Sequence, residues 1–149
     1  MKPPTFRQIP YGSDAFREAC QLRDIVLRQP LGLSLFDEDL TQERDQMHFG
    51  LFAQSAKLIA CAIAVPQSDS IAKLRQMAAS AEYRGKGHGS ALLSCIENHL
   101  IHQGVERLEL HARLTAVPFY KKAGYMEEGD TFTEVGIPHV SMLKTLVNS

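Results

Sequence analysis

The sequence predicts a single domain of mixed α/β class, and three observations lead to that prediction. Segments with the patterns of strands and helices alternate along the chain, as they do in folds that pack helices against a sheet. The 149 residues suit one domain and contain no repeat, low-complexity tract or linker. The composition, with 44% hydrophobic and 22% charged residues, is that of an ordinary globular protein.

The N-terminal part of the chain is expected to form a strand, a helix and an apolar loop. The strand covers residues 5–9, and the helix that follows, which Ser13 or Asp14 can cap, repeats its apolar residues at helical spacing. This helix should end near Arg28, because a proline follows two residues later. The loop over residues 31–37 carries several large apolar side chains, so it either lines a pocket or lid or plugs the core.

The same alternation continues to the centre of the chain. Residues 39–45 predict a short acidic helix. Residues 48–54 and 57–65 have the composition of two strands in a hairpin, and the second is apolar almost throughout, as expected of a strand covered on both faces. A further strand, over residues 71–80, leads into a turn rich in glycine.

A central helix and another strand follow this turn. Gly104 is expected to end the helix. Residues 105–111 alternate between apolar and polar side chains, as a half-buried strand does. The apolar stripe of the central helix is predicted to consist of Ala91, Leu92, Cys95, Ile96 and Leu100.

Charge and residue usage exclude several classes of function. The net charge of −1 argues against a nucleic-acid-binding surface. No apolar run approaches the roughly 18 residues of a membrane span, and the N-terminus lacks the apolar core of a signal peptide, so we expect no membrane partner and a cytoplasmic location. Cys20, Cys61 and Cys95 lack metal-binding spacing, and His99 and His102 have no third ligand nearby, so no metal site is expected.

The strongest chemical signal is the glycine-rich turn between the strand at residues 71–80 and the central helix. Glycine lets the backbone take positive φ and approach a ligand closely, and the first N–H groups of a helix attract an anion. The spacing fits neither the P-loop nor the dinucleotide-binding motif of the Rossmann fold. We expect a phosphate or pyrophosphate to be held by Arg84, Gly85, Lys86, Gly87, His88 and Gly89.

Two motifs carry a resemblance to a known family. The pattern Arg84-x-x-Gly87-x-Gly89 resembles the pyrophosphate-binding motif of the GCN5-related N-acetyltransferases, the GNAT superfamily. The segment from Ala116 to Tyr125, AVPFYKKAGY, resembles the family's short helix after the fifth strand, which carries A-x-x-F-Y and then G-F or G-Y. Two motifs in the right order, about 30 residues apart, are more specific than either alone. The tail over residues 132–142 also resembles the closing hairpin of small bacterial members.

The resemblance implies one N-acetyltransferase domain over residues 1–149. Its fold would be a twisted mixed sheet of about six to seven strands, flanked by about four helices, with a V-shaped splay between strands 4 and 5. Acetyl-CoA, as co-substrate, would lie in that slot. The coenzyme-binding residues would be Met77, Ala78, Ala79, Arg84, Gly85, Lys86, Gly87, His88, Gly89, Arg113, Phe119 and Tyr120. Arg113 stands where the family commonly has Asn.

By the same resemblance, the protein would transfer an acetyl group to a primary amine of a small molecule or protein by direct attack on the thioester. Tyr120 occupies the position of the family's usual general acid, which protonates or stabilises the departing thiolate. The general base stays open among three residues, namely His111, Glu134 and His139. A histidine suits amine deprotonation near neutral pH, because its reference pKa lies near 6.5.

Two other classes of function stay open. The domain could be a non-catalytic module that binds and senses acyl-CoA, or a generic phosphate-binding α/β domain adapted to another nucleotide. The apolar loop at residues 31–37 and the hairpin near residues 130–139 would set the specificity for the acceptor, which the sequence does not identify. Homodimers are frequent in the superfamily, although no feature of this sequence indicates an interface.

Overall fold

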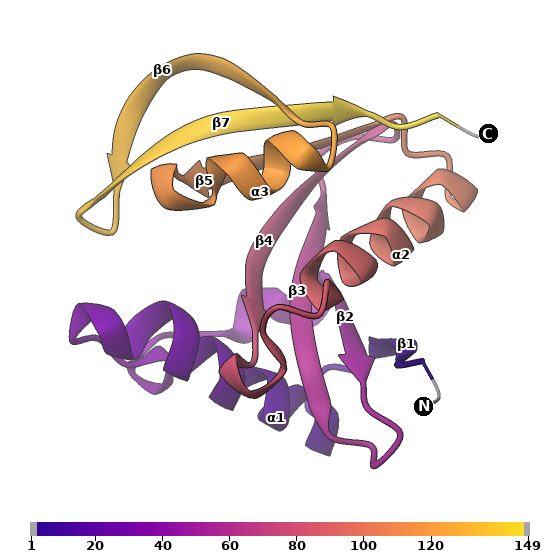
Figure 1. Ribbon diagram of the computed structural model, residues 1–149, viewed down its shortest axis with the longest axis vertical. Coiled ribbons are helices and arrows are strands. Elements are labelled where there is room, and N and C mark those ends of the chain that lie inside the picture. Colours follow the sequence, from indigo (N-terminus) through magenta and orange to yellow (C-terminus); the bar gives the residue numbers. More distant parts are fainter. Residues whose placement is uncertain (1–2, 148–149) are drawn as a thin grey trace. The chain divides into compact units, whose positions relative to one another are not determined.

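The computed structural model describes residues 3–147 of the chain (Figure 1). The chain divides into two compact units. The first unit comprises Met1–Val65 and Gln76–Ile96, and the second comprises Pro66–Arg75 and Glu97–Ser149.

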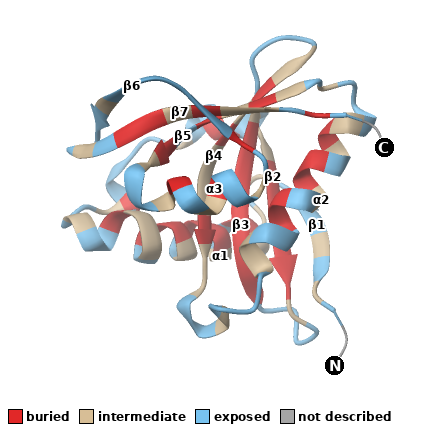
Figure 2. Ribbon diagram, turned by 45° about the horizontal axis from the view of Figure 1, so that its top comes forward, coloured by how far each residue is buried: buried red, intermediate tan, exposed pale blue. Residues whose placement is uncertain are grey.

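The first unit contains three strands and the end of a fourth. They are β1 (Thr5–Ile9), β2 (Met47–Phe52), β3 (Leu58–Pro66) and the last residues of β4 (Ile71–Ala79). β1 pairs antiparallel with β2, and β2 pairs antiparallel with β3. β3 is buried along almost its whole length (Figure 2), which confirms the prediction from its continuous apolar run.

The helical segment after β1 has two parts. Helix α1 (Asp14–Arg23) starts at Ser13, whose hydroxyl oxygen accepts a hydrogen bond of 3.1 Å from the Phe16 N–H, so the predicted N-cap is confirmed. A π-helical turn over Asp24–Arg28 follows without a break. The segment therefore ends where the sequence predicts, but its last turn is wider than that of an α-helix.

The loop that follows is tied into the core at one side chain. Leu35 is fully buried, whereas Leu33 and Phe36 are 49% and 60% exposed. Of these three side chains, only Leu35 fills the core, as one of the two alternatives for this loop predicts. The predicted acidic helix is a 3-10 helix, Thr41–Asp45, and Asp39 accepts hydrogen bonds from the Thr41 backbone N–H and hydroxyl at its start.

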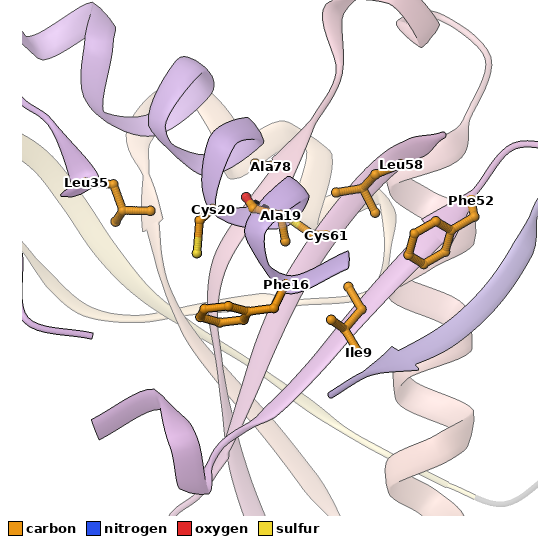
Figure 3. Close-up of a cluster of buried hydrophobic side chains, with 9 residues drawn as sticks. All are labelled: Ile9, Phe16, Ala19, Cys20, Leu35, Phe52, Leu58, Cys61 and Ala78. Atoms are coloured by element: carbon orange, nitrogen blue, oxygen red, sulfur yellow. Dashed lines mark hydrogen bonds between the residues drawn. The ribbon is translucent and has the colours of Figure 1, made fainter. Parts of the chain in front are cut away.

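A cluster of buried apolar side chains fixes α1 against the strands of the first unit (Figure 3). Burial raises the pKa of the Cys61 thiol to about 12, which makes the thiolate inaccessible at neutral pH and agrees with a packing role for this residue. The nine side chains drawn are Ile9, Phe16, Ala19, Cys20, Leu35, Phe52, Leu58, Cys61 and Ala78.

The central helix is α2 (His88–His102), and Gly104, with φ of 89°, ends it as predicted. The prediction of its buried stripe was partly wrong. Ala91 is exposed, and Leu93, which was not predicted, is 1% exposed. The buried apolar side chains are Leu92, Leu93, Ile96 and Leu100. The short side chain of Ala91 made it compatible with either face, whereas Leu93 gains more by burial.

The second unit contains three complete strands and the beginning of β4. They are β5 (Arg107–Arg113), β6 (Met126–Glu134) and β7 (Ile137–Thr145). β5 pairs antiparallel with β7, which pairs antiparallel with β6. β5 starts two residues later than the predicted 105–111 and ends two residues later. Helix α3 (Val117–Lys122) is the short helix that the family motif predicts.

The hydrogen-bonded order of the strands is β1-β2-β3-β4-β5-β7-β6 in a mixed sheet of seven strands. The parallel pairing of β4 with β5 runs from Ile71 opposite Arg107 to Leu74 opposite Leu110 and ends there. The resemblance implies a splay between strands 4 and 5, and the pairing of β4 with β5 stops partway along both strands. The described residues hold three α-helices, since the predicted fourth is the 3-10 helix at Thr41–Asp45. The predicted fold class is confirmed.

Candidate functional site

The predicted anion cradle lies in the first unit, between the end of β4 and the start of α2. Gly85 and Gly87 have φ of 79° and 76°, a conformation that L side chains rarely adopt. Cβ atoms added at either residue would meet nothing within 4 Å, so the backbone is open to a ligand there. The first turn of α2 follows directly and includes Gly89, while Arg84 and Lys86 are exposed beside it. The geometry suits a phosphate group.

The segment predicted to bond the pantetheine arm forms the last residues of β4. Ala78 is buried in the cluster against α1, and Met77 and Ala79 are half-buried. The residue before them, Gln76, has φ of 57°. A non-glycine residue in this conformation inside a strand is unusual, and no sequence pattern predicts it.

The Gln76 side chain connects β4 to two arginines of the preceding helical segment. Its Oε1 accepts hydrogen bonds from Arg23 Nε at 3.4 Å and from Arg28 Nη2 at 3.3 Å. Arg23 in turn donates to both carboxylate oxygens of Glu43, at 2.8 and 2.6 Å, and Arg28 donates to Glu38 at 2.6 Å. No sequence signal identifies this network, because its members are far apart and the π-helical turn has no recognised pattern.

In the second unit, Tyr120 lies on α3 and is buried. Its ring meets that of Phe119 edge-on, with centroids 5.0 Å apart, and packs 5.7 Å from the ring of Tyr125. Burial raises the pKa of the Tyr120 hydroxyl to about 12. The phenol therefore carries its proton at neutral pH and can donate a hydrogen bond.

The Gly-Tyr pair that ends the second motif has a structural role. Gly124 has φ of 98°, and Tyr125 closes the end of α3 by donating its N–H to the Tyr120 carbonyl at 3.0 Å. The Tyr125 hydroxyl donates to Glu97 at 2.7 Å, and Lys144 donates to the other oxygen of that carboxylate at 3.0 Å. Burial and the Glu97 charge raise the pKa of Tyr125, so this hydroxyl also stays protonated. These contacts fix the ring of Tyr125, against which the ring of Tyr120 packs.

The structure brings together the three residues that the sequence offers as general bases. His111 Nδ1 lies 3.0 Å from Glu134 Oε1, and His139 Nε2 lies 3.7 Å from Glu134 Oε2. The ring of Phe132 packs edge-on against His111 at 4.9 Å and stacks on His139 at 6.1 Å. The strand register produces this cluster, because β7 places His139 opposite both Arg113 of β5 and Phe132 of β6.

Protonation in this cluster follows from the hydrogen bonds. Burial opposes ionisation of Glu134, but the hydrogen bond from His111 and the charges of His111, His139 and Lys73 lower the pKa of Glu134 below its ordinary value. Since a carboxylate only accepts, His111 Nδ1 is the donor, and Nε2 of the neutral ring carries the lone pair. His139 donates from Nδ1 to the Ile137 carbonyl at 2.8 Å and is 5% exposed, whereas His111 is 33% exposed. Of the two rings, His111 is the accessible one.

A small pocket of about 80 Å³ adjoins His111 in the second unit. Its polar lining comes from Lys73, Glu109, Glu128 and Ser141, together with His111 itself. The predicted coenzyme contacts Arg113 and Phe119 also belong to this unit, at the end of β5 and on α3.

Two kinds of feature are absent from residues 3–147. No group of three or more His, Cys, Asp or Glu side chains in this range is placed to hold a metal ion. None of the helices described there combines the length and apolar character that a membrane crossing requires.

The comparisons with known proteins agree with the fold. A family model described as an acetyltransferase (GNAT) domain matches residues 31–146. The uncharacterized Bacillus subtilis protein YyaT is 36% identical over 75 residues, which make up 50% of this chain and 51% of that protein. The chain thus spans about half the length of the curated relatives it matches.

Two solved structures extend the similarity over nearly the whole chain. A Lactobacillus plantarum protein provisionally named an N-acetyltransferase has a TM-score of 0.86 at 28% identity, covering 98% of this chain and 100% of that one. An aminoglycoside 6'-N-acetyltransferase complexed with coenzyme A has a TM-score of 0.76 at 16% identity, covering 97% of this chain and 98% of that one. At that identity the second similarity shows the fold alone.

Proposed function

Because this chain belongs to the GNAT acetyltransferase domain family, we propose that it transfers the acetyl group of acetyl-CoA to a primary amine of a small molecule or protein. The aminoglycoside acetyltransferase with the same fold, solved in complex with coenzyme A, supports the choice of co-substrate. The observation that carries the proposal is the turn before α2. There Gly85 and Gly87 have positive φ and leave the backbone open to a diphosphate.

In this proposal the first unit binds acetyl-CoA as a substrate. Main-chain N–H groups of the turn and the first turn of α2 bind the diphosphate, and Arg84 and Lys86 add positive charge. The backbone of Met77–Ala79 bonds the pantetheine arm, because an amide-bearing chain can pair with a strand.

We assign the general base to His111. Its Nε2 accepts a proton from the acceptor's ammonium group, so that the neutral amine can attack the thioester carbonyl. Glu134 holds the ring through Nδ1 and stabilises the imidazolium that forms. The choice of His111 is supported by its 33% exposure, against 5% for His139.

Tyr120 acts at the departing thiolate. A pKa of about 12 lies above that of an ordinary thiol, near 8.5, so complete transfer of the phenol proton to the sulfur is unfavourable. A hydrogen bond from the protonated phenol to the developing thiolate is favourable, and it is stronger in the transition state than in the ground state. Tyr120 therefore stabilises, by hydrogen bonding, the thiolate that leaves as the C–S bond breaks. The second proton, which the new amide nitrogen loses, passes through solvent to that thiolate.

Calorimetric titration with acetyl-CoA tests the coenzyme site, with desulfo-CoA, ATP and NAD as comparators. We expect acetyl-CoA and desulfo-CoA to bind and ATP and NAD to bind much more weakly. Gly87→Ala should weaken binding at least about tenfold, because a left-handed alanine distorts the turn. Gly12→Ala is the matched control, since Gly12 has φ of 79° and equally open surroundings in another turn.

The outcomes separate the alternatives. Equal losses in Gly87→Ala and Gly12→Ala, or equal binding of ATP and NAD, would remove the coenzyme assignment and favour a generic phosphate site. Binding of acetyl-CoA without turnover on a panel of primary amines, and no effect of Tyr120→Phe, would favour a non-catalytic acyl-CoA sensor.

A further inference from the structure

One residue of β4 holds a backbone conformation that its position does not favour. Among the described residues that are not glycine, Ala56, Gln76 and Val135 have positive φ. Ala56 and Val135 lie in the turns of the β2–β3 and β6–β7 hairpins, where this conformation is common. Gln76, with φ of 57°, lies inside a strand, where such a conformation costs free energy and persists only if the surroundings enforce it.

The contacts of the Gln76 side chain supply that enforcement. Its Oε1 accepts hydrogen bonds from two guanidinium groups, those of Arg23 and Arg28. Two charged donors on one amide oxygen fix its position more firmly than a single neutral donor would.

The π-helical turn explains how both arginines reach the same atom. In an α-helix, side chains five residues apart point about 140° away from each other, because each residue turns the helix by about 100°. The bond from the Gln29 N–H to the Asp24 carbonyl closes a wider turn, in which residues five apart lie on nearly the same side. The wider turn therefore aligns Arg23 with Arg28.

Each arginine is itself held by a carboxylate. Arg23 is 2% exposed and makes a bidentate pair with Glu43, which is 7% exposed. Arg28 pairs with Glu38 through Nε and Nη2. A buried ion pair adds little net stability relative to an apolar pair of the same size, but it fixes geometry.

We propose that Arg23 and Arg28, anchored by Glu43 and Glu38, are positioning residues that hold Gln76 in its left-handed conformation. They thereby set the backbone of β4 from Met77 to Ala79 for binding the pantetheine arm of acetyl-CoA. This inference rests on the proposed function for its ligand. Its structural part, the conformation of residue 76, can be measured without a ligand.

A double-mutant cycle tests the proposal. Arg23→Lys keeps the charge but loses the two-pronged guanidinium, and it should raise the Kd for acetyl-CoA by about tenfold. In Gln76→Gly, the glycine can adopt positive φ without a hydrogen bond from either arginine. In that background Arg23→Lys should therefore change the Kd for acetyl-CoA by less than about twofold. Arg17→Lys, at an exposed arginine of the same helix, is the control and should leave Kd unchanged. Arg28→Lys gives the same test at a less buried site.

The conformation itself is measured by NMR, from the ¹³Cα and ¹³Cβ shifts and the φ-dependent HN–Hα coupling of residue 76. Arg23→Lys should move these values toward those of an ordinary strand, and Arg17→Lys should not. Unchanged values in Arg23→Lys, or the same rise in Kd in both backgrounds, would overturn the positioning role while leaving the proposed function intact. Failure of the unmodified protein to bind acetyl-CoA would instead overturn the proposed function and, with it, the ligand named here.

Discussion

The two units hold their candidate residues in different ways. In the first unit, the candidate coenzyme-binding turn is built from backbone, with Gly85 and Gly87 at positive φ, and the nearby β4 segment is tied to a buried Arg23–Glu43 pair. In the second unit, the candidate catalytic residues are side chains, with Tyr120 on helix α3 and the candidate bases on strands. The pair that joins two of these bases, His111 with Glu134, is 33% and 46% exposed.

In the proposed function, the first unit binds the coenzyme and the second unit transfers protons, and the two kinds of construction suit these two tasks. A backbone cradle has no side-chain rotamers to order, and a buried ion pair is screened by salt less than an exposed one, which suits the recognition of an invariant cofactor. A partly exposed histidine held by a carboxylate is accessible to an acceptor amine, which suits proton transfer. The first unit should therefore depend on its carboxylates for stability, and the second should depend on them for pH-dependent activity.

The largest expected effect is the loss of stability when the buried pair is broken. Glu43→Gln leaves the Arg23 guanidinium buried without a counter-charge, and it should lower the free energy of unfolding by about 3–5 kcal/mol. Unfolding in urea measures this change. Glu38→Gln removes the partner of Arg28 but involves a carboxylate that is 41% exposed, so it should cost about 1 kcal/mol or less. Equal losses in the two variants would mean that burial does not decide how much an ion pair of the first unit contributes to stability.

A feature of this molecule could be predicted from sequence when it depends on residues that are neighbours in the chain. The bounds of β1, the Ser13 cap and the Gly85–Gly89 turn depend on residues that are neighbours in the chain, so their patterns were readable. The contact between His111 and Glu134 depends on the register of three strands. The sequence offered both residues with His139 as separate alternatives, and only the fold shows that they meet.

The network around Gln76 could not be predicted for a related reason. The apolar spacing of residues 14–28 suits an α-helix, and nothing in it indicates that the last turn widens. The positive φ of Gln76 is likewise set by side chains that are distant in sequence. Local patterns predict local structure, whereas these features arise from tertiary contacts.

The second-largest expected effect is a loss of catalytic activity when the candidate base of the second unit is replaced. If His111 is the base, His111→Gln should lower kcat about 100-fold, because that is the scale of a lost general base, and should leave the KM for acetyl-CoA unchanged. Steady-state kinetics with the best acceptor of the amine panel measures both. His102→Gln, at an exposed histidine of α2, is the control and should have wild-type kinetics. Equal kcat in wild type and His111→Gln would reassign the base to His139 or to a bound water.

The smallest expected effect is on the stability of the second unit, and it depends on pH. The pKa of Glu134 is lowered in the folded state from an ordinary value of 4.5, despite the opposing effect of burial, because His111, His139 and Lys73 favour its charged form. A lowered folded-state pKa means that the ionised carboxylate stabilises the fold above pH 4.5 and that this contribution disappears as the pH falls through the folded-state value. Because the side chain is 46% exposed, the contribution should stay below about 1 kcal/mol.

Unfolding of wild type and Glu134→Gln at pH 5.5 and pH 3 measures this contribution. The difference in free energy of unfolding should be present at pH 5.5, shrink at pH 3, and shrink also at pH 5.5 when salt screens the pair. Glu127→Gln, on the same strand but paired with Lys121, controls for the loss of a surface carboxylate. A difference that grows toward pH 3 would mean that the neutral carboxyl, and not the carboxylate, is the form that the cluster stabilises. The exposed pair would then resemble the buried one in being structural, and the division of roles between the units would fail.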